Sequence, residues 1–180
     1  MKTYIALIRG INVGGKSMVP MHDLVMLFKN AGVEKIRTYI NSGNMVFTSK
    51  NVMTSSFLTG IRSKIKAKYG FEPDIQIVEL KDLEEAISGN PFPESNPESL
   101  HVGFLASPPE KPDVIKLESL KKDSERFRLS GRIFYLYAPE GVGRSKLAAN
   151  SEKILGVSMT DRNWRTVCKI RDLAYEIGAK

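Results

Sequence analysis

The spacing of apolar residues along the chain predicts short strands and amphipathic helices in a regular order. A mostly apolar run at 4–11 predicts the first strand, and Leu24, Leu27 and Phe28 have the spacing of a helix that stops at Gly32. The other elements expected in this half are strands at 35–40, 45–48 and 74–80, a helix capped by Thr54 that ends at Gly70, and a short helix at 81–88. The first half is therefore expected to run strand, helix, hairpin, helix, strand, helix.

The same order returns in the second half, after a proline-rich segment at 90–97 that indicates a loop or linker. Expected there are strands at 101–106, 126–129, 133–137 and 157–160, and helices at 112–120, 145–155 and 163–177. The turn dipeptide Ser42-Gly43 matches Ser130-Gly131, and Gly70 matches Gly156, so the period is about 86 to 88 residues. A period of this length indicates a duplicated domain, because solenoid repeats are much shorter.

These patterns predict an α+β fold of two tandem ferredoxin-like halves, each βαββαβ plus a helix, with antiparallel sheets that carry helices on one face. The expected domains are an N-terminal lobe at 1–92 and a C-terminal lobe at 93–180, related by internal duplication.

Composition and charge narrow the functional classes. The chain has 180 residues, 42% of them hydrophobic, and 27 lysine and arginine residues against 20 acidic ones, which gives a formal charge of +7. This balance favours an anionic partner such as nucleic acid or a nucleotide, although a merely solvated basic surface gives the same count. No apolar run approaches the roughly 20 residues of a membrane span, and Cys168 is the single cysteine. We therefore expect a cytoplasmic protein without membrane contact or cofactor.

The segment at 10–17 satisfies the pattern G-x-x-x-x-G-K-[ST] of phosphate-binding loops. Pro20 argues against a nucleotide hydrolase, because the helix of such a loop must begin at the lysine. A simpler role is open: Arg9, Gly14, Gly15 and Lys16 could bind an anion through side chains and backbone amides. Alternatively, the glycines only let the chain turn from strand to helix.

Two further polar segments are candidate ligand sites. Asn12 and the predicted turn with Asn41, Ser42 and Asn44 could orient a polar ligand, although such residues more often simply form the turn. The candidates around the start of the last helix are Arg162, Asn163, Arg165 and Lys169. Asn163 is expected to cap that helix, and the three basic side chains could surround an anion where the helix dipole favours negative charge. We predict no metal site, and no catalytic residue can be assigned.

Three segments carry a family resemblance. They are 9–16 (Arg-Gly-Ile-Asn-Val-Gly-Gly-Lys), 39–47 (Tyr-Ile-Asn-Ser-Gly-Asn-Met-Val-Phe) and 160–167 (Thr-Asp-Arg-Asn-Trp-Arg-Thr-Val). The chain resembles a bacterial family that is known only as domain of unknown function 1697, and the resemblance spans nearly its whole length. Membership implies a two-lobed α+β fold, and it implies no agreed reaction, cofactor or partner.

Three functions follow as hypotheses. The first is a binding module for an anionic ligand, nucleic acid or nucleotide, that uses the basic and glycine-rich loops. The second is an enzyme that acts on a small polar or phosphorylated metabolite held at the glycine loop. The third is a self-associating scaffold without chemistry of its own, and the oligomeric state is left open.

Overall fold

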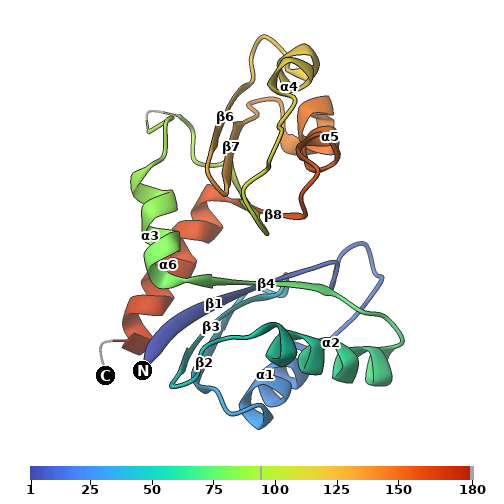
Figure 1. The fold of residues 1–180 in the computed structure, drawn as a ribbon, viewed down its shortest axis with the longest axis vertical. Helices are drawn as coiled ribbons and strands as arrows, with labels where there is room; N and C mark the ends of the chain where they lie inside the picture. The colour runs from blue at the N-terminus through green and yellow to red at the C-terminus, as the bar shows by residue number, and fades with distance from the viewer. Residues whose placement is uncertain (94, 179–180) are drawn as a thin grey trace. The chain divides into compact units, whose positions relative to one another are not determined.

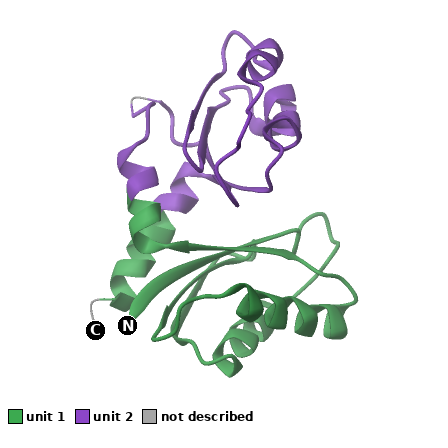
Figure 2. Ribbon diagram, viewed as in Figure 1, with its two compact units in different colours: residues 1–84, 169–180 green, residues 85–168 purple. Residues whose placement is uncertain are grey.

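The computed structural model describes residues 1–93 and 95–178, which divide into two compact units (Figure 2). Unit 1 comprises residues 1–84 and 169–180, and unit 2 comprises residues 85–168. The boundaries fall inside two helices, α3 (Leu80–Ser88) and α6 (Trp164–Gly178). The predicted lobes, 1–92 and 93–180, rest on the sequence repeat alone, and their boundary stays a prediction.

Unit 1 contains a four-stranded antiparallel sheet in the order β2-β3-β1-β4 (Figure 1). Its elements are β1 (Lys2–Arg9), α1 (Met21–Asn30), β2 (Glu34–Tyr39), β3 (Asn44–Ser49), α2 (Ser55–Tyr69) and β4 (Asp74–Glu79), joined by the start of α3 and the end of α6. Thr54 caps α2 as predicted, since its hydroxyl accepts a hydrogen bond from the amide of Phe57, and Gly70 ends the helix in the left-handed conformation.

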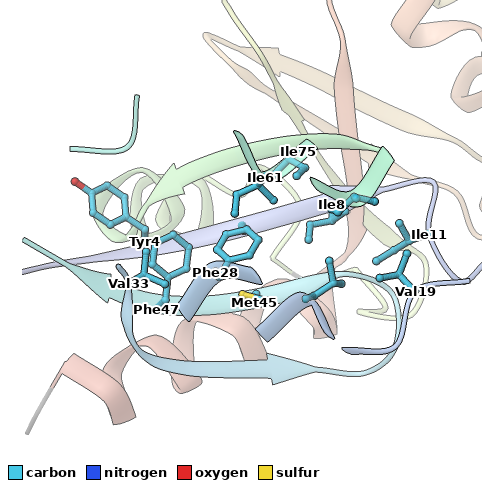
Figure 3. Close-up of a cluster of buried hydrophobic side chains, with 13 residues drawn as sticks. Tyr4, Ile8, Ile11, Val19, Phe28, Val33, Met45, Phe47, Ile61 and Ile75 are labelled. Carbon is cyan, nitrogen blue, oxygen red and sulfur yellow. The ribbon is translucent and has the colours of Figure 1, made fainter. Parts of the chain in front are cut away.

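The main core of unit 1 lies between its sheet and the helices α1 and α2 (Figure 3). Alternate residues of β1 and β3 supply Tyr4, Ile8, Met45 and Phe47, and the ring of Phe28 from α1 packs 5.5 Å from that of Phe47. This alternation follows from the two-residue period of a strand.

The opposite face of this sheet is buried as well. Ile5 and Leu7, which lie between the core residues of β1, are fully buried, and Val46 of β3 is 1% exposed. At the end of α6, the carbonyl of Ile177 accepts a hydrogen bond from Lys35. The prediction of helices on one face is therefore incomplete for this sheet, because its central strands bury both of their faces.

Unit 2 repeats the strand order, as β6-β7-β5-β8, and all its pairs are antiparallel. Its elements are β5 (Leu100–Leu105), α4 (Val114–Leu120), β6 (Arg126–Ser130), β7 (Ile133–Tyr137), α5 (Lys146–Leu155), β8 (Met159–Asn163), a short 3-10 turn (Val142–Arg144), the end of α3 and the start of α6. The prediction of an α+β chain with antiparallel sheets in two similar halves is confirmed.

The core of unit 2 joins Leu105, Phe134 and Leu136 of the sheet to Leu117 of α4 and Leu147 of α5. The helices α4 and α5 therefore cover one face of this sheet. On the other face, the hydroxyl of the buried Tyr135 donates a hydrogen bond to the carbonyl of Ala86 in α3. In residues 1–93 and 95–178, no helix has the length and apolar character required to cross a membrane.

Candidate anion-binding site

Three connections of unit 1 meet at one end of its sheet. They are the β1–α1 loop at 10–20, the β2–β3 turn at 40–43 and the α2–β4 loop at 70–73, and together they are named the loop end here. The strand registers bring them together, because Arg9 at the end of β1 pairs with Asp74 at the start of β4, and Leu7 pairs with Asn44 at the start of β3. Six of the twelve predicted site residues lie in these loops: Asn12, Gly14, Gly15, Lys16, Asn41 and Ser42. Two more, Arg9 and Asn44, lie at the strand ends that border the loops.

Asn12 connects the β1–α1 loop to the β2–β3 turn by hydrogen bonds. Its side-chain amide donates to the carbonyls of Val19 (2.9 Å) and Asn41 (2.8 Å), and its side-chain oxygen accepts from the amide of Val19 at 2.8 Å. Asn12 itself has a φ of 55°, a value that asparagine tolerates better than most residues. The role of Asn12 in this structure is to join the loops, so a ligand would have to displace those bonds to use its side chain.

The glycine-rich segment forms a tight hairpin turn. Val13 and Lys16 pair as an isolated antiparallel bridge, and Gly14 and Gly15 between them have φ values of 59° and 73°. Two positive φ values in succession define a turn of type I′, in which glycine avoids steric strain. Helix α1 begins only at Met21, so the sequence pattern of a nucleotide-hydrolase loop is accidental here, as Pro20 indicated.

This turn leaves polar groups directed at solvent. Among the described residues, the amides of Gly14 and Gly15 have no hydrogen-bond partner, and Lys16 makes no ion pair. Lys16 is exposed at the end of the turn. Successive backbone amides in a turn are groups that bind anions in proteins, and a lysine adds positive charge.

The second turn serves mainly to build the sheet. The side-chain amide of Asn44 is fully buried and donates to the hydroxyl of Ser42 (2.9 Å) and to the carbonyl of Tyr39 (3.3 Å). Gly43 packs so closely on β1 that an added Cβ would lie 2.6 Å from the carbonyl oxygen of Ile8. Of the two interpretations offered by the sequence, the contacts of Ser42 and Asn44 favour the turn.

Two arginines face one carboxylate in the elements that border the loop end. Arg9 and Arg62 of α2 both contact Asp74, at 3.5 Å and 3.4 Å, so one carboxylate faces two guanidinium groups. Arg62 also donates to the carbonyl of Ile75, while its Nε, which is buried, has no partner among the described residues. This group carries a net positive charge beside the glycine turn.

A second ion pair at this end connects the start of α1 to the end of α2. Asp23 accepts hydrogen bonds from Lys68, at 2.6 Å, and from Tyr69. These two hydrogen bonds lower the pKa of Asp23, and the same contact with Asp23 raises the pKa of Lys68 and of Tyr69. The pair fixes the two helices against each other and neutralises Lys68, so Lys68 contributes little to the free positive charge.

The chain resembles proteins known from sequence and structure. A family model described as "Protein of unknown function (DUF1697)" matches residues 1–135, three quarters of the chain. The chain belongs to this family. A solved structure of a conserved bacterial protein, SP0830 from Streptococcus pneumoniae, is similar to this DUF1697 chain with a TM-score of 0.68 and 30% identity, and the match covers 96% of this chain and 98% of that one. No curated protein matches the chain.

In this DUF1697 chain, the two segments at 9–16 and 39–47 that carried the family resemblance lie side by side at the loop end. Apart from the Asn12 bonds, the amide of Ile8 donates to the carbonyl of Gly43 at 2.8 Å. The sequence alone did not place these segments together, since they are separated by helix α1.

The third segment lies at the start of α6, where an anion site stays a prediction. Asn163 does cap the helix, since its side-chain oxygen accepts from the amide of Arg165, and its side-chain amide donates to the carbonyl of Glu98 at 2.8 Å. Arg165 is paired with the Glu98 carboxylate at 2.7 Å. Burial lowers the pKa of Arg162, and its guanidinium donates to the carbonyl of Asp161. Lys169 lies one helical turn beyond Arg165 on α6, and both residues are exposed.

Unit 2 contains two polar contacts that the sequence did not reveal. The guanidinium of Arg126 lies over the rings of Phe92 and Tyr137, 5.0 Å and 4.8 Å from their centroids. His101 Nδ1 lies 2.8 Å from Asp161, whose strand pairs with that of His101. Arg126 and Tyr137 are opposite each other in the hairpin of β6 and β7. Because the hairpin was predicted, this pairing could have indicated the contact between Arg126 and Tyr137.

A groove of about 590 Å³ also opens beside β2 in unit 1, lined by Lys35, Ile36, Arg37, Glu176 and Ile177. Lys35 donates to the carbonyl of Ile177, and the lining includes the carboxylate of Glu176, which disfavours an anion. The loop end therefore remains the better candidate for an anion. Among the described residues, no group of three or more histidine, cysteine, aspartate or glutamate side chains could hold a metal ion.

Proposed function

We propose that this protein is a binding module whose loop end in unit 1 takes an anionic, phosphate-bearing ligand. The observation that carries the proposal is the exposed turn with Gly14, Gly15 and Lys16, whose two amides and ammonium group have no partner among the described residues. Donors held in place by a rigid loop bind an anion without first losing conformational freedom.

The distribution of charge supports this location. In the sequence, the residues of unit 1 include 15 lysines and arginines and 9 acidic residues, whereas those of unit 2 include 12 and 11, so the formal charges are +6 and +1. Nearly all of the excess positive charge of the chain is therefore in unit 1. A field of this sign raises the local concentration of anions and speeds their association.

The glycine turn is rigid because hydrogen bonds close it on both sides. The amide of Lys16 donates to the carbonyl of Val13, and the amide of Asn12 donates to the carbonyl of Ser17, both at 3.1 Å. With Asn12 bound in turn to Asn41, the loop is tied to the sheet as well. These hydrogen bonds support a loop that has its binding conformation before the ligand arrives.

The test is a titration of the full chain with a fluorescent single-stranded oligonucleotide and with inorganic polyphosphate at two salt concentrations. We expect binding that weakens with salt, and Lys16→Gln should reduce the slope of log K against log salt by about 0.7, the value for one phosphate contact on a single strand. Lys111→Gln is the matched control, because Lys111 is exposed in the loop that follows β5, as Lys16 is in the loop that follows β1. No binding, or an equal loss from both variants, would refute the proposal.

We also propose that the two sheets are ferredoxin-like sandwiches that arose by internal duplication, with lobes at 1–92 and 93–180. The element order βαββαβ in each unit and the shared strand order support this proposal. The single cysteine supports a location in the cytoplasm. The enzyme and the self-associating scaffold stay hypotheses, and no described contact favours either.

A further inference from the structure

The loop end exposes apolar side chains beside its basic turn. Three of them have more than half of their surface in solvent: Val13 (66%), Met18 (59%) and Ile40 (54%). Each is a chain neighbour of one of the residues that the hydrogen bonds of Asn12 join, so all three stand on backbone that Asn12 holds in place. These three exposed side chains of the loop end are named the apolar rim here.

Ile40 has a backbone conformation that is unfavourable for a β-branched residue. Its φ is 49°, in the left-handed region where a β-branched side chain is strained, and the side chain is exposed rather than packed. Asparagine or glycine would fit that conformation at lower cost. The apolar side chain of Ile40 therefore adds nothing to the core while it adds strain, which is a pattern found at binding surfaces.

We infer that the loop end binds single-stranded nucleic acid, with Lys16 at a backbone phosphate and the apolar rim against unpaired bases. The inference rests on the proposed function and specifies its ligand. An unpaired strand presents phosphates and apolar base faces within a few ångströms of each other, which matches a lysine beside an apolar surface. A duplex hides its base faces by stacking, and an inorganic phosphate or small phosphorylated metabolite would leave the apolar rim uncovered.

The experiment measures the affinity of the full chain for three probes of equal length by fluorescence anisotropy. They are a labelled strand of about twelve thymidines, within the site sizes common for single-strand binders, an abasic strand with the same phosphates, and the corresponding duplex. We expect the thymidine strand to bind about tenfold more tightly than the abasic strand, because burial of roughly 60 Å² of apolar surface against the bases corresponds to about that factor.

Variants then assign this preference to the apolar rim. Ile40→Asn removes the apolar side chain and suits the positive φ, so it should fold normally and reduce the preference for bases at least threefold, with the abasic strand unaffected. Met18→Gln should act in the same direction and provides a second variant should the turn change in the first. Val52→Asn is the control, because Val52 is also apolar, is 69% exposed, and lies outside the loop end.

The outcomes separate the two proposals. Salt-sensitive binding with equal affinity for thymidine and abasic strands, or a preference that survives both rim variants, overturns the inference and leaves the proposed function standing. Tighter binding to the duplex than to the thymidine strand also overturns it. Absence of binding to every probe, inorganic polyphosphate included, refutes the proposed function itself.

Discussion

The two units have the same strand order but differ at the end of their first strand. In unit 1, β1 runs into an 11-residue loop at 10–20 that contains a type I′ turn and is tied to the β2–β3 turn by Asn12. In unit 2, β5 is followed by the shorter segment at 106–113, which contains three prolines. A common sheet therefore carries a structured polar loop in one unit and a short connection in the other.

The equivalent helices differ in the same way. Helix α2 of unit 1 carries Arg62, Lys64, Lys66 and Lys68 and no acidic residue, whereas α5 of unit 2 carries two lysines, Lys146 and Lys153, and one acidic residue, Glu152. Since both helices lie between the third and fourth strands of their sheets, their position in the fold does not determine their charge. The comparison shows why function must be argued from the loops and charges of each unit rather than from the shared strand order.

The largest expected effect is on stability and compares the two matching turns, at Gly43 in unit 1 and Gly131 in unit 2. Gly43→Ala should lower the free energy of unfolding by about 3 kcal/mol, because a Cβ would collide with the backbone of Ile8 and the φ of 77° disfavours alanine. Gly131→Ala, at the matching turn of unit 2, should cost only about 1 kcal/mol, since nothing lies within 4 Å of its Cβ. Urea denaturation measures both, and equal costs would show that the first turn does not depend on close packing against β1.

The second effect concerns the loop that distinguishes unit 1. Asn12→Ala should cost about 2 kcal/mol, since it deletes three hydrogen bonds and leaves the amide and carbonyl of Val19 without these partners. Asn150→Ala in α5 removes one exposed hydrogen bond to Lys146 and should change stability by less than about 0.5 kcal/mol. Thermal unfolding compares the two, and a stable Asn12→Ala protein would mean that the loops of unit 1 are held by other contacts.

A smaller effect is expected from the stacked arginine of unit 2. Arg126→Ala should destabilise the protein by about 1 kcal/mol, because it removes a guanidinium that lies over two aromatic rings and donates a hydrogen bond to Ser95. Arg128→Ala, two residues along the same strand, should change stability by less than about 0.5 kcal/mol. If the two variants have the same urea midpoint, the stacking of Arg126 does not stabilise unit 2.

The smallest effect depends on pH and belongs to the α1–α2 contact of unit 1. The hydrogen bonds from Lys68 and Tyr69 hold the pKa of Asp23 below its usual range, so its contribution is present above the pKa of an unfolded aspartate and is lost as the pH falls through the folded pKa. Asp23→Asn should therefore lower the melting temperature slightly at pH 7, with a difference from the wild type that vanishes in strong acid.

Asp123→Asn is the control for this pH series, since Asp123 is an exposed carboxylate of unit 2 and makes no ion pair with any described residue. Melting curves from pH 7 down to about pH 2 record the difference. A difference between Asp23→Asn and the wild type that stays constant over this range would contradict the role of the Asp23 carboxylate.

The sequence was sufficient for the order of elements, because apolar periodicity and glycine stops depend on local residues. It also contained a sign of burial on both faces that the predicted arrangement did not use: residues 4–8 are apolar without interruption, and a continuous apolar run is typical of strands covered on both sides. The first strand was predicted to reach residue 11, whereas β1 ends at Arg9, since Gly10 and Asn12 turn the chain out of the sheet.

The candidate site was only partly accessible from sequence. The residue types at 10–17 and 41–44 predicted turns, but the bond between Asn12 and Asn41 joins residues 29 positions apart, and spacing does not encode such a pair. The partners of Arg9 and Arg165 were missed for the same physical reason. Asp74 meets Arg9 through the register of β1 on β4, and Glu98 meets Arg165 through a loop whose course depends on the bonds of Asn163.

The most direct test of the central claim, that the loop end of unit 1 is the binding surface, is amide hydrogen exchange of the full chain with and without a saturating single-stranded oligonucleotide. The account predicts slower exchange at 10–20 and 40–43, with the amides of Gly14 and Gly15 among the most protected, and no change in the loop at 106–113 of unit 2. Protection confined to unit 2, or an unchanged pattern at the loop end despite bound oligonucleotide, would contradict it.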